Sequence, residues 1–325
     1  MKQVYCPAIF LAAQCVCLLG LLCFATGCPA GDAPANALAA VPRETVAIGS
    51  LEVVLPQRVA QLDKRFVPEC SGLVASKKYP GVFWTHSDSD SPATIVAIHA
   101  DGTVVKPPAA SAAYRGITLT GAVNNDWEAI TTDDLGRLII ADMGNNHSSR
   151  RNLCLLAFPE PDPQKTLAVT PKKIAVRYAD QTDFPDKKKR FDSEAAFVWN
   201  GAVYVLTKRW SDTWTVLYRL NMTSASSGVF EPVTSFDSHG LVTDASISPD
   251  GRLLAILTYH GLWAFVLPSS GKNPLSGSVL YRPLQFPMTS WQAEALAFRD
   301  NDHVLIGTEQ GELYVVALSR LAKVR

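Results

Sequence analysis

The sequence predicts an all-β protein and, within that class, a β-propeller. From about residue 46 onward, the chain is a succession of short apolar and aromatic runs, and turn signals such as ADG, WNG and SPDG separate these runs. No helical period longer than two turns interrupts them. Five segments also repeat one hairpin pattern, and a repeat of roughly 50 residues is typical of a four-stranded propeller blade.

The repeated hairpin has a constant order of parts. A polar or acidic residue and a small residue come first, followed by an apolar strand, a turn, and a second apolar strand that ends in a polar cluster. The five copies begin at residues 69, 126, 192, 243 and 293. Their key polar positions, separated by 57, 66, 50 and 50 residues, are Ser71, Glu128, Glu194, Asp244 and Glu294.

The number of strands favours five blades, although the last blade shows only three strands before the chain ends at Arg325. We expect the apolar run at 50–62, SLEVVLPQRVAQL, to supply the missing outer strand and close the ring. Closure removes the exposed edges of an open sheet. The alternative is six blades, which requires a further blade from 100–125 or 160–190, where no sixth copy of the hairpin occurs.

The N-terminus predicts a targeting segment. Lys2 precedes an apolar run at 8–24, and small residues follow, ending in ATGC at 25–28. This ending resembles a bacterial lipobox, which implies a lipid-modified Cys28 and an anchor in the cell envelope. An uncleaved transmembrane anchor and simple secretion are the alternatives, and all of them place the protein outside the cytoplasm.

This interpretation divides the chain into three parts. Residues 1–28 are predicted to be a lipoprotein signal peptide and residues 29–44, rich in Ala, Pro and Gly, a flexible tether. Residues 45–325 are predicted to form a single propeller domain, which we expect to be a monomer.

Composition excludes several functions. Lys plus Arg number 30 and Asp plus Glu number 30, so no net charge favours nucleic acid as a partner. Outside the leader and Cys28, only Cys70 and Cys154 remain, which predicts two buried thiols rather than a disulfide framework. The sequence also lacks zinc-ligand spacing, a GxSxG elbow, a phosphate-binding loop and a dinucleotide fingerprint.

The key positions of the five hairpins are expected to form a ring, because the innermost strand of every propeller blade lines the central axis. Two carboxylates about 6 Å apart repel by roughly 3 kcal/mol at an effective dielectric of 20, so four of them need neutralisation. Protonation of one or two acids is one way, inward-reaching arginines are a second, although the flanking residues are Ala, Gly, Ser, Thr and Trp, and a hard divalent cation is a third. Ca²⁺ accepts six to eight oxygen ligands of variable geometry, which suits carboxylates together with a hydroxyl. The alternative is a structural ring, in which water-bridged acids hold the blades together through backbone N–H groups.

These segments resemble two groups of known proteins. The ring positions Ser71, Glu128, Glu194 and Glu294 are similar to the axial pattern of calcium-activated nucleotidases (apyrases), whereas Asp244 departs from it. The segments DWEAI, ADMGNN, FDSEA, VTDAS and QAEAL resemble bacterial secreted propellers of the SMP-30 and calcium-dependent phosphotriesterase type. The resemblance implies a propeller with a central Ca²⁺.

The polar clusters that end the second strands are expected on the same face as the ring, because antiparallel neighbours place the end of one strand beside the start of the other. Basic residues facing a bound cation suit a small anionic substrate. The predicted catalytic residues are His86, Asp142 and Arg151, and the predicted ligand-binding residues are Asn145, Asn146, Lys208 and Arg209.

Two functions follow from these features. The first is a calcium-dependent hydrolase of a phosphate ester or lactone, in which a carboxylate or His86 deprotonates water. The second is a non-enzymatic binding or scaffold propeller with a structural ring, because fold alone does not give function. A quinone-dependent redox propeller is disfavoured, since the sequence lacks the expected Trp-docking repeats and vicinal cysteines.

Overall fold

The computed structural model describes residues 41–325 except 223–224 and 291. The predicted signal peptide, Cys28 and most of the predicted tether lie outside the described residues. Strands dominate the described part, which contains no α-helix and only the short 3-10 turns η2 (Met288–Ser290) and η3 (Leu318–Arg320). The prediction of an all-β protein is therefore confirmed. None of the described helical segments has the length and apolar character needed to cross a membrane.

The five repeated segments form five antiparallel hairpins, as the sequence predicts. Each hairpin pairs an inner strand with the next strand along the chain. The hairpins are β3 (Cys70–Ala75) with β4 (Val82–Ser87), β8 (Trp127–Thr132) with β9 (Arg137–Asp142), β13 (Ser193–Trp199) with β14 (Ala202–Thr207), β17 (Val242–Ile247) with β18 (Leu253–Thr258), and β21 (Ala293–Phe298) with β22 (His303–Thr308).

Further strands extend each hairpin outward. The pairings continue from inner to outer strand beyond each hairpin, and one parallel pairing joins the outer strands of the second and third hairpins into a single nine-stranded sheet. The added strands are β5 (Thr94–His99), β6 (Val104–Val105), β7 (Ile117–Leu119) and β11 (Ala168–Val169) on the first hairpin; β10 (Cys154–Pro159) and β12 (Lys172–Tyr178) on the second; β15 (Trp214–Asn221) and β16 (Ser227–Asp237) on the third; β19 (Gly261–Val266), β20 (Val279–Pro283) and β24 (Ala322–Lys323) on the fourth; and β23 (Glu312–Ala317) on the fifth.

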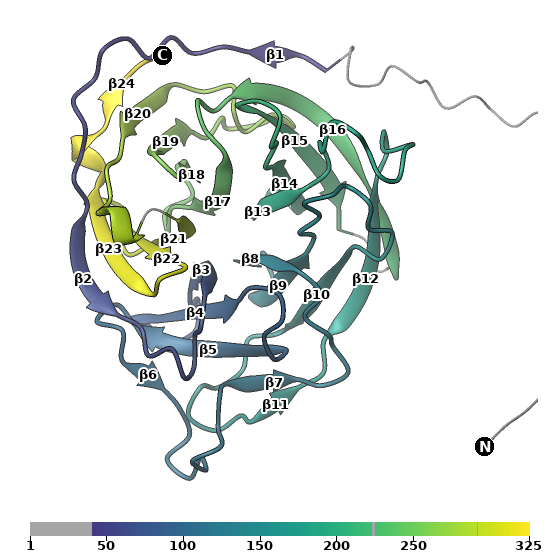
Figure 1. Cartoon of the computed structure of the whole chain (residues 1–325), viewed down its shortest axis with the longest axis vertical. Helices are drawn as coiled ribbons and strands as arrows, with labels where there is room; N and C mark the ends of the chain where they lie inside the picture. Colours follow the sequence, from purple (N-terminus) through teal and green to yellow (C-terminus); the bar gives the residue numbers. More distant parts are fainter. Residues whose placement is uncertain (1–40, 223–224, 291) are drawn as a thin grey trace, which may run out of the picture. The chain divides into compact units, whose positions relative to one another are not determined.

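The five inner strands pack against one another in a closed cycle. β3 contacts β8, β8 contacts β13, β13 contacts β17, β17 contacts β21, and β21 contacts β3. Figure 1 shows these strands around a common centre, with the later strands of each sheet farther out. This arrangement is a β-propeller, and it brings the starts of all five inner strands together.

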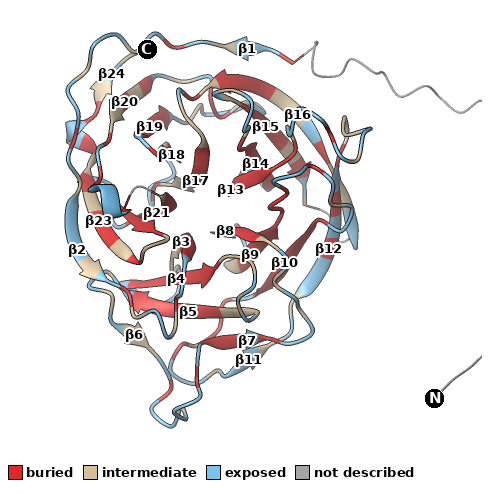
Figure 2. Ribbon diagram, viewed as in Figure 1, coloured by how far each residue is buried: buried red, intermediate tan, exposed pale blue. Residues whose placement is uncertain are grey.

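The hydrophobic core lies between neighbouring sheets. Trp84 and Ile95 from the first sheet pack with Trp127 and Phe158 from the second, for example. Inner strands are therefore buried on both faces, and all seven residues of β13 are buried. Figure 2 shows the same pattern of burial across the inner strands. Double burial explains why these strands are near-continuous apolar runs in the sequence.

The N-terminal segment follows the outside of three sheets. β1 (Arg43–Glu44) pairs with β16, Val54 bridges to Leu284, and β2 (Gln57–Gln61) pairs with β23 as the outer strand of the sheet that contains the fifth hairpin. Glu44 also forms a 2.8 Å ion pair with Arg325. The last residues of the predicted tether, 41–44, thus belong to the folded part of the chain.

Candidate metal centre

A β-bulge marks the start of every inner strand. The pairing register shifts between Cys70 and Gly72, and the same shift occurs at the equivalent place in the other four inner strands. A bulge leaves one residue unpaired and redirects its side chain. The bulged residues are Ser71, Glu128, Glu194, Thr243 and Glu294.

The bulge in β17 falls on Thr243, so Thr243 rather than Asp244 occupies the position equivalent to the other four. Hydrogen bonds support this register. Ser71 Oγ donates to the carbonyl of Trp127 on the next strand (3.2 Å), and Thr243 Oγ1 donates to the carbonyl of Ala293 on its next strand (2.7 Å). The prediction that Asp244 occupies the ring position is therefore wrong by one residue, because Thr243 occupies it.

Asp244 has a different environment from the ring acids. Its carboxylate accepts hydrogen bonds from the backbone N–H groups of Ala245 (2.7 Å) and Leu296 (2.6 Å), and its side chain is fully buried. Burial raises the pKa of Asp244 well above its ordinary value, while these backbone donors and that of Leu73 lower it. Asp244 thus joins β17 to β21 and β3.

Glu128 lies at the centre of a cluster of carboxylates. One oxygen from each of Asp88, Asp126 and Glu128 lies within 4.8 Å of the other two, and the same holds for Glu128, Asp192 and Glu194. Glu128 and Glu194 are the buried ring residues of β8 and β13, and Asp192 is also fully buried. We call these five residues the carboxylate cluster.

Mutual repulsion and burial act together on the carboxylate cluster. Burial, followed by the charge of Glu194, raises the pKa of Glu128 well above its ordinary value. Burial, followed by the charge of Asp88, raises the pKa of Asp126 to about 6. No ion pair in the described part of the chain reaches Asp88, Asp126, Glu128 or Asp192. Four of the five carboxylates therefore have no cationic partner among the described residues, and their charged forms are destabilised unless a proton or a cation is bound.

Gly144 provides the space in which two of these carboxylates meet. A Cβ atom added at Gly144 would overlap Glu128 Oε1 and would lie 2.5 Å from the Cγ and Oδ2 atoms of Asp126. No real Cβ makes such contacts, so only glycine fits without displacing the acids. The backbone is thus shaped around the two side chains.

Residues that follow the second strands form a further layer beside the ring. Ser87, Asp142, Thr207, Thr258 and Thr308 each lie opposite the first residue of an inner strand, which confirms that the strand ends lie next to the ring. The next residue in each hairpin is therefore also close to the ring. These residues are Asp88, Met143, Lys208, Tyr259 and Glu309.

Lys208 is the cation of this layer. Its buried ammonium group lies 3.0 Å from Glu194 Oε1 and 3.5 Å from Glu294 Oε1, and Tyr259 donates a 2.6 Å hydrogen bond to Glu294. Burial lowers the pKa of Lys208, but the carboxylates of Glu194 and Glu294 outweigh burial and raise it overall. Lys208 thus connects β13 with β21 and is not available to a ligand as an unpaired charge.

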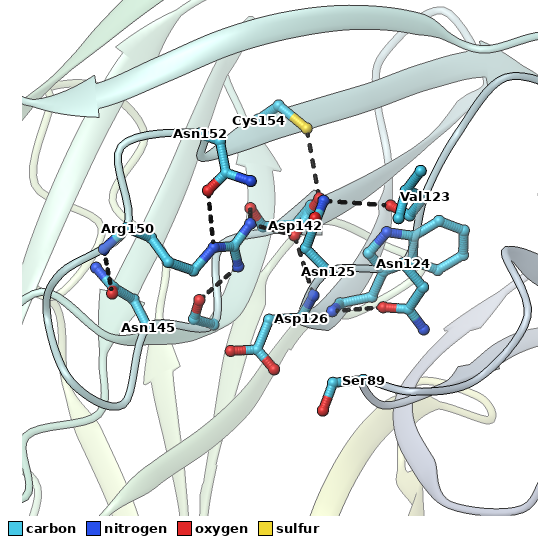
Figure 3. Close-up of polar contacts among 12 residues, drawn as sticks. Ser89, Val123, Asn124, Asn125, Asp126, Asp142, Asn145, Arg150, Asn152 and Cys154 are labelled. Atoms are coloured by element: carbon cyan, nitrogen blue, oxygen red, sulfur yellow. Dashed lines mark hydrogen bonds and ion pairs between the residues drawn. The ribbon is translucent and has the colours of Figure 1, made fainter. Parts of the chain in front are cut away.

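Asp142, predicted to be catalytic, organises the loop that carries Asp126. Its carboxylate accepts hydrogen bonds from Asn125 Nδ2 (2.7 Å), from the backbone N–H of Asp126 (3.2 Å) and from Arg150 Nη2 (2.6 Å). Figure 3 shows Asp142 between Arg150 and Asn125, with Asp126 below them. These bonds occupy both oxygens, so Asp142 positions Asp126.

Asn145, predicted to bind ligand, has a similar positioning role. Its backbone N–H donates to Asp192 Oδ1 (2.6 Å), and its side-chain oxygen accepts from the N–H groups of Ser149 and Arg150. Asn146, next to it, is exposed. Asn145 therefore fixes a loop against the carboxylate cluster, while Asn146 remains accessible.

His86, predicted as a general base, is buried away from the carboxylate cluster. Its Nδ1 lies 3.2 Å from the carbonyl of Ser87, and its ring packs edge-on against Trp127. A Cβ atom at Gly72 would lie 2.5 Å from its Nε2. Burial lowers the pKa of His86 to about 4, so the ring is neutral at pH 7. This environment does not favour His86 as a base for a ligand at the ring.

The predicted arginines also have partners. Arg209 forms a 2.6 Å ion pair with Asp212. Arg151 is exposed, with its guanidinium carbon 3.8 Å from the centre of the Phe184 ring. Only Arg151 of the predicted anion-binding cations has its charge free of an ion pair within the described residues.

Sequence reasoning missed Asp192, Thr243 and Tyr259. A signal for Asp192 was present, because an acid precedes the ring residue by two positions in three hairpins: Glu69 and Ser71, Asp126 and Glu128, Asp192 and Glu194. No comparable signal exists for Thr243 or Tyr259, since their positions depend on the bulge and on strand pairing.

Comparisons with known proteins give a similarity of structure alone. No family model matches the chain, and no curated protein matches it in sequence. Among solved structures, a catalytically inactive virginiamycin B lyase from Staphylococcus aureus with quinupristin is 11% identical, with a TM-score of 0.39 over 76% of this chain and 66% of that chain. A protein assigned as a gluconolactonase is 13% identical, with a TM-score of 0.45 over 86% of this chain and 96% of that chain.

Proposed function

We propose that the protein is a five-bladed propeller that β2 closes and that holds Ca²⁺ in its carboxylate cluster. The closed cycle of five inner strands and the pairing of β2 with β23 support the blade number and the closure. The observation that carries the metal proposal is the group of four neighbouring carboxylates, Asp88, Asp126, Glu128 and Asp192, none of which forms an ion pair with a described residue.

The donors of the carboxylate cluster fit a hard divalent cation. Asp88, Asp126, Glu128, Asp192 and Glu194 offer only oxygen, and neither triple of neighbouring ligands includes a histidine or a cysteine. Oxygen ligands favour Ca²⁺ or Mg²⁺, and Ca²⁺ tolerates irregular arrangements and several carboxylates more readily than Mg²⁺ does. The space at Gly144, which a Cβ atom would fill, is consistent with a site built for these side chains. The resemblance to apyrases implies that Ser71 and Glu294 are also ligands of the central Ca²⁺. In this structure, however, Ser71 donates a hydrogen bond to Glu128, and Glu294 forms an ion pair with Lys208.

We further propose that the site hydrolyses a phosphate ester or a lactone. A bound divalent cation would supply Lewis-acid polarisation of the ester oxygen. Asp126 is the residue best placed to accept a proton from water, because its side chain is only half-buried and the Asp142 carboxylate fixes its backbone. Asp142 and Asn125 hold the Asp126 loop in place, and Arg151 offers a positive charge to an anionic substrate.

The proposed location is the bacterial cell envelope. The apolar run at 8–24 and the ATGC ending at 25–28 support a lipoprotein signal whose lipidated Cys28 anchors the protein. Metabolic labelling with a radioactive fatty acid would test this proposal, because replacing Cys28 with Ala should abolish the label while a Cys23→Ala control retains it.

Calcium-dependent turnover is the direct test of the activity. Nucleotide, phosphodiester and lactone substrates are assayed with Ca²⁺ and with EGTA, using wild type and Asp126→Asn. We expect turnover on at least one class that EGTA abolishes and that Asp126→Asn reduces at least a hundredfold. Absence of turnover on every class would refute the hydrolase proposal and leave the metal proposal to the binding measurements below.

A scaffold propeller is the second candidate function. The observation that favours it is the use of ring residues as links between blades: Ser71 and Thr243 bond the backbone of the next blade, and Lys208 connects two blades. In this case Ca²⁺ stabilises the fold but the protein hydrolyses none of the substrates, so Asp126→Asn has no turnover to reduce.

A further inference from the structure

Trp210 is the only exposed tryptophan among the described residues, and 47% of it is accessible to solvent. It lies three residues after the end of β14, in the loop that leads to β15. The other described tryptophans are buried or half-buried. A single exposed apolar side chain is common on protein surfaces and indicates nothing by itself. The position of Trp210 relative to the carboxylate cluster therefore decides whether its exposure has a use.

The indole edge of Trp210 is bonded to the carboxylate cluster. Its Nε1–H group donates a 3.0 Å hydrogen bond to Oδ2 of Asp192, and the other oxygen of Asp192 accepts from the backbone N–H of Asn145 (2.6 Å). Asp192 is fully buried, whereas about half of Trp210 is exposed. The indole ring therefore begins at the cluster and extends from it into solvent. A ligand held at the cluster has this aromatic surface directly beside it.

The loop between β14 and β15 is held in place at both ends. At its start, the backbone N–H of Lys208 donates to the carbonyl of Asp192 (2.9 Å). At its end, the carboxylate of Asp212 forms a 2.6 Å ion pair with Arg209 and accepts the backbone N–H of Trp214 (3.0 Å). A surface that is already ordered loses little conformational entropy when a ligand binds. The exposed indole is thus a pre-organised contact surface.

The charges around the indole ring favour an uncharged aromatic partner. The ammonium group of Lys208 lies 5.0 Å from the centre of the Trp210 ring and would repel an organic cation there, as would Ca²⁺ in the cluster. Arg209 and Asp212 pair with each other, so neither charge of the loop is free for a polar ligand. Two aromatic rings attract each other beyond the effect of the area that they bury. The ring is therefore best matched by another aromatic ring.

We propose that Trp210 is a specificity-determining residue, whose exposed indole ring binds the aromatic ring of an aryl phosphate ester while the anionic group of the ester is held at the carboxylate cluster. This inference rests on the proposed Ca²⁺ site and names the substrate class of that site. The hydrogen bond to Asp192 fixes the indole ring relative to the metal ligands.

The test compares two probes that the proposed hydrolysis does not cleave, phenylphosphonate and cyclohexylphosphonate. They carry the same anionic group, and the cyclohexyl ring is at least as large, so a preference for phenyl reports an aromatic contact. Titration calorimetry measures both affinities for the purified full chain at saturating Ca²⁺. We expect the wild type to bind phenylphosphonate about two- to tenfold more tightly than cyclohexylphosphonate. In EGTA both affinities should fall at least tenfold.

Two variants of Trp210 separate the aromatic contact from the hydrogen bond to Asp192. Both Trp210→Leu and Trp210→Phe lose the N–H donor, but only Trp210→Phe keeps an aromatic ring. We expect the ratio of the two affinities to fall to about one in Trp210→Leu and to stay above one in Trp210→Phe. The control Leu135→Ala removes an apolar side chain that is 78% exposed in the turn between β8 and β9, and it should keep the wild-type ratio.

Three results would overturn the inference: no phenyl preference in the wild type, a preference that Trp210→Leu retains, and a preference that persists unchanged in EGTA. Equal loss in both Trp210 variants would also overturn it, because the missing hydrogen bond to Asp192 would then explain the result. Equal kcat/KM for methyl phosphate and phenyl phosphate would refute the inference and leave the hydrolase proposal standing. Phosphonate binding that depends on Trp210, without turnover of any ester, would refute the hydrolase proposal alone.

Discussion

Two acids at the starts of inner strands, Glu128 on β8 and Asp244 on β17, are both buried but have opposite environments. Glu128 faces other carboxylates and receives one hydroxyl hydrogen bond, from Ser71 (3.2 Å). Asp244 receives hydrogen bonds from backbone N–H groups and lies outside the carboxylate cluster. The comparison teaches that the donors around a buried acid, and not its burial, separate a carboxylate left among other carboxylates from a structural link between blades.

The largest expected effect is on the structural side of this comparison. Asp244→Ala leaves the backbone N–H groups of Ala245 and Leu296 buried without an acceptor, so we expect the free energy of unfolding to fall by about 3 kcal/mol or more. Urea denaturation measures this loss, which should be equal in Ca²⁺ and in EGTA. The exposed control Asp302→Ala should change stability by less than about 0.5 kcal/mol.

The next effect is on the metal side. Ca²⁺ at one hundred times its dissociation constant should stabilise the wild type by about 2.7 kcal/mol, which raises Tm by about 5–10 °C. The double variant Glu128→Gln and Glu194→Gln should lose this shift because it lacks two ligand charges. In EGTA the variant relieves repulsion at Glu128 but also removes the Glu194 charge that pairs with Lys208, so the calcium shift of each protein is measured from its own Tm in EGTA. A calcium shift of wild-type size in the double variant would refute the metal centre.

Gly144 provides a test that leaves every ligand in place. The added methyl group of Gly144→Ala overlaps Glu128 and Asp126 and must displace them, so we expect calcium affinity to fall at least tenfold, about 1.4 kcal/mol. Calorimetric titration with Ca²⁺ measures the change. In the control Gly240→Ala the new atom meets only the side chain of Thr258, at 3.1 Å, and the affinity should stay the same.

The smallest effect separates the two ring hydroxyls. Thr243→Val and Ser71→Ala each remove one hydrogen bond to the next blade, which should cost about 1 kcal/mol of stability. Ser71 also bonds to Glu128, so Ser71→Ala should in addition weaken calcium binding, whereas Thr243→Val should not. Thermal unfolding with and without Ca²⁺ distinguishes them, and equal calcium shifts in both variants would contradict the assignment of Ser71 to the cluster.

Part of the candidate site could be predicted from the sequence. Glu128 and Glu194 follow from alignment of the hairpins, and Asp126 and Asp192 repeat at the same distance before them. The displacement of Asp244 could not be predicted, because TDAS aligns with DSEA by residue type while the bulge in β17 falls one residue earlier. The inward direction of the Lys208 side chain could not be predicted either, because its partners Glu194 and Glu294 come from different strands.

The sequence by itself determined the all-β class and the five hairpins, because alternation of apolar residues and turn chemistry are local properties of the chain. The tertiary structure alone decided which acids meet and which residue of β17 occupies the ring. The physical reason is that side chains on a strand alternate with a period of two. A single bulged residue therefore changes which side chains point together, and only the packing of distant strands fixes where the bulge falls.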